Sequence, residues 1–248
     1  MIFDALASQG IAGPDYLLMS GVVLVGALLQ GIGGIGFAMF SAPLAGLFFP
    51  GLAPGPLLAL GGAVSLMSAL RERAHVDWPL VGVTLLGRFA GSALAVLVLS
   101  LLAPTPIAVL YAVMILAAVA LSVAGWQVAP SRTNLAVAGL ASGLMGTITS
   151  AGAPPFAIAM QRLEPGRLRS TVGCVLAAGA FVSIILLAAV GRFGRQELVL
   201  SLWLAPWVVA GFTLSGRLAA RISSQGVRRL LLALAGFGAV GILVKTLG

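Results

Sequence analysis

Hydrophobic residues run in long stretches along the whole chain, and short polar or turn-forming segments separate them. The apolar segments lie near 15–31, 36–49, 56–72, 79–102, 106–126, 133–149, 153–163, 168–191, 197–221 and 227–247. Most are long enough to cross a hydrocarbon core of ~30 Å as a helix that rises about 1.5 Å per residue. The short alternating segments of a membrane β-barrel are absent from the sequence. We therefore expect an all-α integral membrane protein with eight to ten membrane segments.

The composition supports this class. Of the 248 residues, 60% are hydrophobic and 8% are charged, which leaves too little charge to cover a soluble domain. The net charge is +8, and all but one of the 14 basic residues are Arg. In a membrane protein, we interpret these arginines as topology signals and lipid-headgroup contacts, not as a nucleic-acid surface. The single Cys174 cannot form a disulfide or a metal site, and we expect it to be a small core residue.

The second half of the chain echoes the first. QGIGGIGFAMFSAP at 30–43 aligns with SGLMGTITSAGAPP at 142–155, an offset of 112 residues, and HVDWPL at 75–80 aligns with RQELVL at 195–200, an offset of 120. Weak internal symmetry of this kind is typical of transporters. We divide the chain into an N-terminal tail (1–14), a first repeat (15–126), a linker (127–132) and a second repeat (133–248), which together form one membrane domain.

The basic residues predict the orientation of these repeats. With an odd number of segments per repeat, the second half is inverted, and an N-terminus outside the cell places most basic residues in inner loops. These inner residues are Arg71, Arg73, Arg132, Arg162, Arg167, Arg169, Arg217, Arg221, Arg228 and Arg229. The outer regions hold only Arg192, Arg195 and Lys245. Because positive charge accumulates on the inner side of membranes, we predict an inverted repeat with both termini outside.

Two glycine-rich stretches interrupt the apolar pattern at matching places, and each precedes a short segment. The segments 36–49 and 153–163 reach only about 16–21 Å as helices, which is short for the hydrocarbon core, and the sequence leaves open whether they span the membrane or re-enter. Irregular backbone inside a membrane is tolerated only where it is buried in protein or lines a cavity. A helix that restarts after a break offers unpaired N–H groups and partial positive charge to an anion.

We therefore place a substrate site at the two breaks. The candidate residues are Gln30, Gly31, Gly33, Gly34, Gly36 and Ser41 in the first copy, and Gly146, Thr147, Thr149, Ser150 and Gly152 in the second. The alternative is that such glycines only let helices pack closely, as GALLQG (26–31) and GRFAGS (87–92) could. Two clusters at matched positions, each followed by a short segment and a Pro, favour a binding site.

The chain resembles the sulfite exporter TauE/SafE family of bacterial membrane transporters. The matching stretches are GIGGIGFAMFSAP (31–43), RAHVDW (73–78) and the degenerate second copies GTITSAGAPP (146–155) and GRFGRQEL (191–198). The second half departs from the family pattern, because its glycine run is thinned and Glu197-Leu198 replaces the Asp-Trp pair. The resemblance implies a multi-pass protein of the bacterial inner membrane that moves small sulfur-containing or organic anions such as sulfite, sulfoacetate, thiosulfate and sulfonates.

Arg88 is the charged residue deepest in an apolar segment, about ten residues from its start. An Arg at that depth usually faces an interior cavity or a partner, so we expect Arg88 to bind the anion. The alternative is a snorkelling side chain, which we prefer for Arg217 near the end of its segment. His75 and Asp77, which flank a loop, are weaker candidates for gating or coupling, and an interfacial anchor with a helix cap explains them as well.

These features predict a transporter, and specifically an exporter that works by alternating access. All six acidic residues lie near segment ends or in the tail, which disfavours coupling through a buried carboxylate. An anion channel and an inverted-repeat permease for another metabolite remain alternatives. An intramembrane enzyme is disfavoured, because one His in a loop and one Cys in an apolar run supply neither a nucleophile with its base nor a metal cluster. We expect no cofactor, and the sequence leaves the oligomeric state open.

Overall fold

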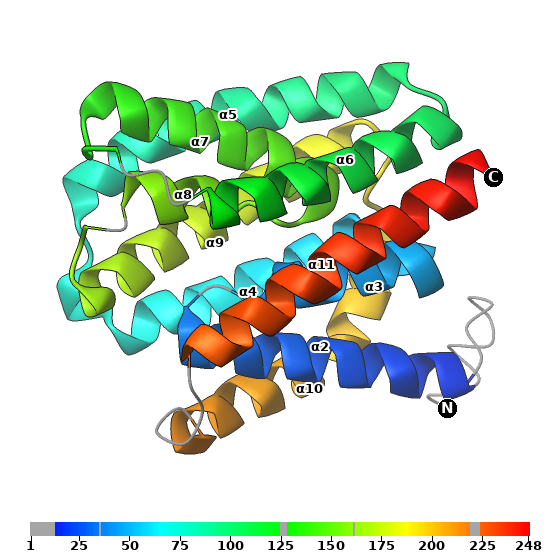
Figure 1. The fold of residues 1–248 in the computed structure, drawn as a ribbon, viewed down its shortest axis with the longest axis horizontal. Coiled ribbons are helices and arrows are strands. Elements are labelled where there is room, and N and C mark those ends of the chain that lie inside the picture. Colours follow the sequence, from blue (N-terminus) through cyan, green and yellow to red (C-terminus); the bar gives the residue numbers. More distant parts are fainter. Residues whose placement is uncertain (1–12, 35, 125–127, 161, 219–223) are drawn as a thin grey trace.

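The computed structural model describes residues 13–34, 36–124, 128–160, 162–218 and 224–248, and these residues form helices connected by short turns (Figure 1). The first half comprises α2 (Gly13–Gly33), α3 (Phe37–Phe48), α4 (Gly55–Arg71), α5 (Trp78–Leu101) and α6 (Pro104–Val123). The second half comprises α7 (Arg132–Thr149), α8 (Pro154–Ala159), α9 (Pro165–Ala189), α10 (Arg195–Leu218) and α11 (Ser224–Leu247). Two 3-10 turns, η1 (Pro50–Leu52) and η2 (Arg73–His75), flank α4.

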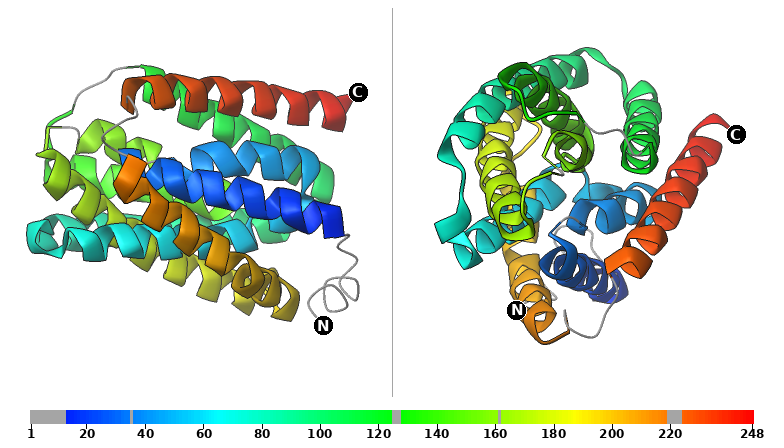
Figure 2. Two further views of the ribbon diagram at one scale, coloured as in Figure 1. Left: turned by 90° about the horizontal axis from the view of Figure 1, so that it is seen from below. Right: turned by 60° about the vertical axis from the view of Figure 1, so that its left-hand side comes forward.

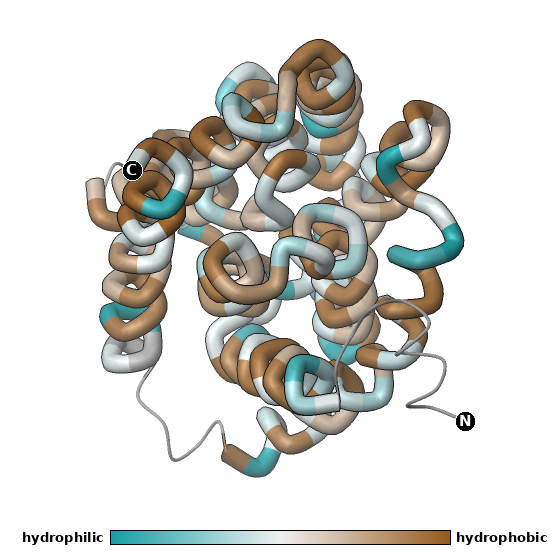
Figure 3. Tube along the Cα trace, turned by 90° about the vertical axis from the view of Figure 1, so that its right-hand side faces the viewer, coloured by the Kyte–Doolittle hydropathy of each residue, from teal (hydrophilic) through white to brown (hydrophobic). Residues whose placement is uncertain are grey.

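Six helices in the described part of the chain are long and apolar enough to span a membrane: α2, α5, α6, α9, α10 and α11. The all-α membrane fold is therefore confirmed. Hydrophobic positions predominate along these helices (Figure 3), and large side chains such as Leu86 and Phe237 are more than 70% exposed. In water such exposure would be costly, whereas in a membrane these side chains face lipid tails.

The two short segments are shorter than the sequence suggested. The 12 residues of α3 extend about 18 Å and the six of α8 about 9 Å, so neither crosses the hydrocarbon core alone. Other boundaries moved by a few residues. The first repeat's last helix ends at Val123, with 125–127 outside the described residues, and α10 ends at Leu218, with 219–223 and hence Arg221 also outside them.

The packing of the helices repeats when the two halves are exchanged. Helix α5 packs against α7, and its counterpart α10 packs against α2; α4 packs against α9, and α6 against α11. The pair α3 and α11 likewise has a counterpart in α8 and α6. Figure 2 shows α2 (deep blue) and α10 (orange) side by side in both views. This exchange is the arrangement expected of two related repeats, and the inversion of one repeat stays a prediction.

The described start of α2 and the end of α11 lie at the same end of the bundle (Figure 1). The end of α4 and the starts of α7, α9 and α11 lie at the opposite end, and these carry most of the basic residues. Which end faces the cell interior stays a prediction from the charges.

Basic side chains also satisfy backbone carbonyls at helix C-termini, which have no partner within their own helix. Arg71 donates to the carbonyl of Gly31 at 2.7 Å, at the end of α2, and Arg192 donates to Leu99 at the end of α5. Arg228 and Lys245 do the same for the last turns of α6 and α3. These basic side chains therefore tie neighbouring helices together.

Glycines bring α5 and α7 into backbone contact. A methyl group on Gly87 would overlap the carbonyl of Ala136, and one on Gly91 would overlap that of Leu140. On the facing helix, a methyl group on Gly139 or Gly143 would overlap carbonyls of α5. These are two small-xxx-small pairs, which let membrane helices approach closely without a hydrophobic driving force. The packing interpretation of GRFAGS is therefore correct.

We expect Gly91→Ala to destabilise the protein by about 1–3 kcal/mol, because the added methyl group forces α5 away from α7. The matched control is Gly82→Ala on the same helix, where a methyl group meets nothing within 4 Å. Thermal unfolding in detergent, followed by loss of monodisperse protein, measures both variants. Equal melting temperatures for the two would contradict the close α5–α7 contact.

Candidate functional site

Both helix breaks have the same backbone geometry. Gly34 and Ser150 lie in the left-handed region, with φ of 76° and 64°, directly after the last residues of α2 and α7. The amide of Gly34 donates to Gln30, and that of Ser150 donates to Gly146, each at 2.7 Å. The two breaks therefore correspond at an offset of 116 residues (150 − 34). The offset of 112 inferred from the sequence was wrong here by about one helical turn.

Several of the predicted site residues lie within helices and not in the breaks. Gly31 and Gly33 belong to the last turn of α2, so the first break begins only at Gly34. Gly31 packs against Ser215, and Gly33 is exposed with open space beside it. Likewise Gly146, Thr147 and Thr149 lie in the last turn of α7. The glycine-rich stretches thus contribute less free backbone than the sequence suggested.

A small cavity of about 30 Å³ lies between the two breaks. It is lined by Gln30, Gly36, Phe37, Ala38, Met39, Leu58, Gly61, Gly62, Ser65, Arg88, Ser150, Ala151, Gly152, Ala153, Pro154, Leu176 and Ala180. Helices α4 and α9 form its side walls, and the starts of α3 and α8 face it. A space of this size holds roughly two water molecules.

Gln30 bridges the first break. Its side-chain oxygen accepts the amide of Phe37, the first residue of α3, at 3.1 Å, and its side-chain nitrogen donates to the Ser65 hydroxyl at 3.0 Å. All three residues are buried. A buried unpaired amide is costly, so this link stabilises the restart of the chain in α3 and fastens it to α4.

The two short helices offer different groups to the cavity. The first-turn amides of Ala38 and Met39 have no partner within α3, and both residues line the cavity. Helix α8 begins instead with Pro154 and Pro155, which carry no N–H. Helix α8 therefore lacks N–H donors at its first two positions, and anion binding at either helix start stays a prediction.

Arg88 stands beside the second break. The residue is 2% exposed, and its Nη1 donates to the carbonyl of Ser142 at 3.3 Å and also to the Ser142 hydroxyl. That hydroxyl donates to the carbonyl of Gly152 at 2.5 Å, so Ser142 links the guanidinium to the break. The Nε of Arg88 is buried without a hydrogen-bond partner among the described residues. The guanidinium is thus held in position but not fully satisfied.

Glycines make room for this side chain. A methyl group on Gly179 of α9 would overlap Nε of Arg88, and methyl groups on Gly152 and Gly146 would lie 2.8 and 3.1 Å from its terminal nitrogens. The guanidinium therefore occupies a slot that three glycines from α7, the break and α9 leave open. Close fit of this kind fixes the direction of a long flexible side chain.

Within the described part of the chain, no carboxylate forms an ion pair with Arg88. The second repeat does not supply a matching charge either. Gly211 packs against the Leu24 carbonyl as Gly91 packs against that of Leu140, so α5 and α10 correspond at an offset of 120. Buried Val208 then takes the place of Arg88. One uncompensated positive charge therefore distinguishes the two halves of the cavity.

The family model described as Sulfite exporter TauE/SafE matches residues 18–242 of the chain. The chain belongs to this family. No curated protein and no solved structure matches the chain. Family membership and the membrane-spanning helices together make the protein a membrane transporter.

The cavity of this TauE/SafE transporter contains some of the predicted residues and not others. Gln30, Gly36, Arg88, Ser150 and Gly152 line it, and Gly146 lies behind the Arg88 guanidinium. The predicted residues Gly31, Gly33, Gly34, Ser41, Thr147 and Thr149 do not line it. Whether any of these residues binds substrate stays a prediction.

The three hydroxyls outside the cavity bond within the protein. Ser41 donates to Val22 at 3.5 Å, and Thr149 donates to the carbonyl of Met145. Thr147 shares a hydrogen bond of 2.8 Å with Ser183. Their local partners account for these hydroxyls without a ligand.

Sequence reasoning missed the partners of the two bridging side chains. Ser65 on α4 and Ser142 on α7 had no distinguishing motif, since single serines are common in membrane helices. Gly61 and Gly62 line the wall formed by α4, and a methyl group on Gly62 would lie 2.8 Å from Ala180. The adjacent glycines in an otherwise apolar helix were the signal that could have identified this wall.

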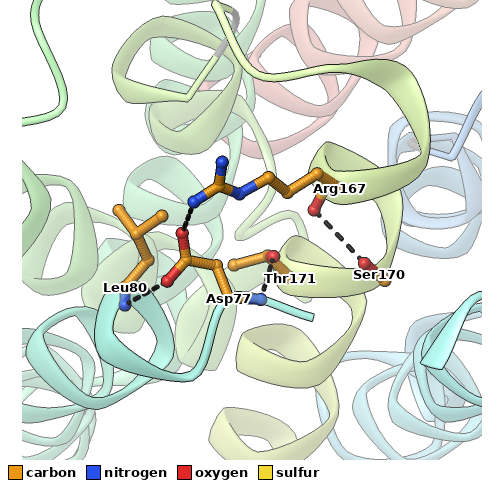
Figure 4. Close-up of polar contacts among 5 residues, drawn as sticks. All are labelled: Asp77, Leu80, Arg167, Ser170 and Thr171. Carbon is orange, nitrogen blue, oxygen red and sulfur yellow. Dashed lines mark hydrogen bonds and ion pairs between the residues drawn. The ribbon is translucent and has the colours of Figure 1, made fainter. Parts of the chain in front are cut away.

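Asp77 does not line the cavity and forms an ion pair with Arg167 (Figure 4). Its carboxylate also accepts the amide of Leu80 at 3.2 Å and caps α5, and its backbone amide donates to the Thr171 hydroxyl. His75 is exposed in η2. The cap interpretation of Asp77 is therefore correct, and a gating role for either residue stays a proposal.

We expect Ser65→Ala to destabilise the protein by about 1 kcal/mol, because it leaves the Gln30 amide buried with one bond fewer. Ser68→Ala is the matched control on α4: this hydroxyl is also buried but has no partner among the described residues. Thermal unfolding in detergent is the measurement. Greater destabilisation by Ser68→Ala than by Ser65→Ala would show that the Gln30 bridge is unimportant.

Proposed function

We propose that this transporter moves small sulfur-containing or organic anions, such as sulfite, sulfoacetate or thiosulfate, through the cavity between the two breaks. The observation that carries the proposal is the Arg88 guanidinium, which is buried beside this cavity with an unpaired Nε and without a carboxylate partner in the described chain. Family membership suggests the range of substrates, and the positive charge beside the cavity favours an anion among them.

Electrostatics favours an anion at this position. A charged side chain deep in a membrane costs about 2.5–3.5 kcal/mol on insertion scales and more in simulations, unless something compensates it. Ser142 supplies neutral acceptors only, and no acidic side chain of the described residues pairs with Arg88. A substrate carrying negative charge would offset this cost, and a guanidinium can hold two oxygens of one oxyanion at the same time.

The groups on the opposite side of the cavity fit the same substrate. The first-turn amides of α3 donate hydrogen bonds and carry the positive end of the helix dipole. Ala38 and Met39 of this turn line the cavity together with Arg88. An oxyanion between them would contact the start of α3 on one side and Arg88, which Ser142 holds against the second break, on the other, so its binding would link the two breaks.

The cavity supports a carrier over a channel. Its volume of about 30 Å³ is far below that of a continuous water-filled pore, and both breaks contribute to its wall. A carrier of this architecture exposes a central site alternately to the two sides of the membrane. The described acidic residues lie at helix ends, which supports transport driven by the anion's own gradient and the membrane potential. That potential contributes about 2.3 kcal/mol per charge per 100 mV.

Ion pairs distinguish the two ends of the transporter. At the end predicted to be inner, Arg169 pairs with Glu72 at 2.8 Å and Arg167 pairs with Asp77. Both acids precede α5 and both arginines lie in α9. At the other end, the counterpart Glu197 accepts the amide of its neighbour Gly194 and forms no ion pair across helices within the described residues. We propose that the two ion pairs close the inner side, so Asp77 acts in gating through Arg167.

Arg88→Ala should reduce anion flux by roughly a hundred-fold, because one bidentate charge-assisted contact is lost. Arg88→Lys should recover only part of this loss, since an ammonium keeps the charge but not the planar fork. The measurement is uptake of labelled sulfite, sulfoacetate and thiosulfate into proteoliposomes under an imposed membrane potential.

The control for Arg88 is Arg217→Ala, which removes an exposed arginine from another membrane helix and should leave flux within two-fold. Saturable flux that survives Arg88→Ala would show that Arg88 is not part of the binding site. The two breaks alone would then bind the anion. Flux that is insensitive to potential would contradict an electrogenic carrier.

Breaking the Glu72–Arg169 pair should open the inner side. In a Cys174→Ser background, Ala38→Cys reports access to the cavity by its rate of reaction with an impermeant thiol reagent in inside-out vesicles. We expect Glu72→Lys or Arg169→Glu to raise this rate about two- to five-fold, as for a partly exposed ion pair. The double variant, which restores opposite charges, should return the rate to the parental value. Additive rates without this rescue would contradict a closing role for the pair.

A further inference from the structure

A second and larger cavity, of about 430 Å³, lies at the opposite end of the bundle from the ion pairs. Gly46 of α3, Ile107 and Ala108 of α6, Ile148 of α7 and Ile242 of α11 contribute to its walls. Its volume is within the range of small-molecule sites, whereas the central cavity holds only a few atoms. Nothing in the site described above uses this space.

Arg192 is the charged residue among those that line this cavity, and it stands in the connection between α9 and α10. Its Nη2 donates to the Leu99 carbonyl at 2.5 Å, which orients the guanidinium and leaves its other donors available. The Tyr111 hydroxyl already donates to the carbonyl of Ala42 at 2.8 Å. The cavity therefore combines one cationic group with otherwise apolar walls.

The larger cavity is separated from the central one by a thin layer. Pro54 lines the larger cavity and Ser150 lines the central one, and the Ser150 hydroxyl donates to the Pro54 carbonyl at 3.0 Å. Ile148, two residues before Ser150, faces the larger cavity. An anion that leaves the Arg88 site at the second break would therefore enter this space next.

We propose that this cavity is a vestibule site that binds anions carrying a short apolar group, such as alkyl sulfonates, with the anionic group at Arg192. The inference rests on the proposed function, because it identifies the occupant as an anion in transit. Complementarity supports this ligand class: Arg192 offers charge to one end of such a molecule, and Ile107, Ile148 and Ile242 offer apolar surface to the other. A fully hydrated inorganic oxyanion would leave these walls unused.

A phospholipid headgroup combines the same two properties, so the experiment separates the two sources. The protein carries Cys174→Ser and Ala108→Cys and is placed in nanodiscs of zwitterionic phosphatidylcholine. A neutral, hydrophilic maleimide labels the thiol at position 108. Butanesulfonate, methanesulfonate and butanol are compared as protecting ligands, and the measurement is repeated in nanodiscs that contain anionic lipid.

We expect butanesulfonate to slow labelling, methanesulfonate to act only at higher concentration, and butanol to have little effect. Arg192→Gln should weaken the protection at least about ten-fold, as expected for loss of a charged hydrogen bond. The matched control is Arg195→Gln, an exposed arginine three residues away that should leave protection unchanged.

Three results would overturn the proposal. A thiol at position 108 that stays unreactive in folded protein would show that the cavity is closed to solvent. Equal protection by butanesulfonate with and without Arg192→Gln would show that Arg192 does not contact the anion. Slow labelling that depends on anionic lipid and not on the sulfonate would make a lipid the occupant.

The failure of this proposal is distinguishable from failure of the proposed function. Sulfite flux that persists while any of these results occurs would leave the proposed function intact. Protection by butanesulfonate without any flux would contradict that function and keep the binding site.

Discussion

The need to pair every backbone polar group away from water shapes this transporter more than any other constraint. A continuous helix meets the need by itself, but two interrupted helices at membrane depth do not. At the first break, the Gln30 side chain accepts the free amide of Phe37, and Arg71 donates to the carbonyl of Gly31. At the second break, the Ser142 hydroxyl donates to the carbonyl of Gly152. Each irregular segment is thus stabilised by polar side chains from the surrounding helices.

The same side chains determine which charge the centre of the protein carries. Ser142 satisfies the second break and also holds the guanidinium of Arg88, so the break and the buried charge depend on one residue. Glycines at the α5–α7 contact place the backbone of Arg88 against α7, and Gly179 leaves room for its side chain. The position of the buried charge thus depends on close helix packing as well as on the residue type.

The two repeats share an architecture but differ in chemistry. Helix α3 starts with residues that carry amide N–H groups, whereas α8 starts with Pro154 and Pro155, and Arg88 has Val208 as its counterpart. The first half therefore supplies both the helix start that carries amide donors and the buried positive side chain. Ion pairs also join α9 to the α4–α5 connection at one end only, within the described residues. Differences of this kind make the two related halves chemically unequal.

The sequence by itself determined the membrane class, most helices and the unusual position of Arg88 inside an apolar segment. Long apolar runs report burial in lipid whatever their neighbours are, and a charge within such a run indicates a special environment without any knowledge of contacts. Helix ends at the breaks depended on the tertiary structure. Gly31 looks like a helix breaker in isolation, yet packing against α10 and the Arg71 bond stabilise it in the last turn of α2. The alignment of the breaks, the partners Ser65 and Ser142, and the second cavity likewise followed only from structure, because they join residues 35 or more positions apart or lie where no motif marks them.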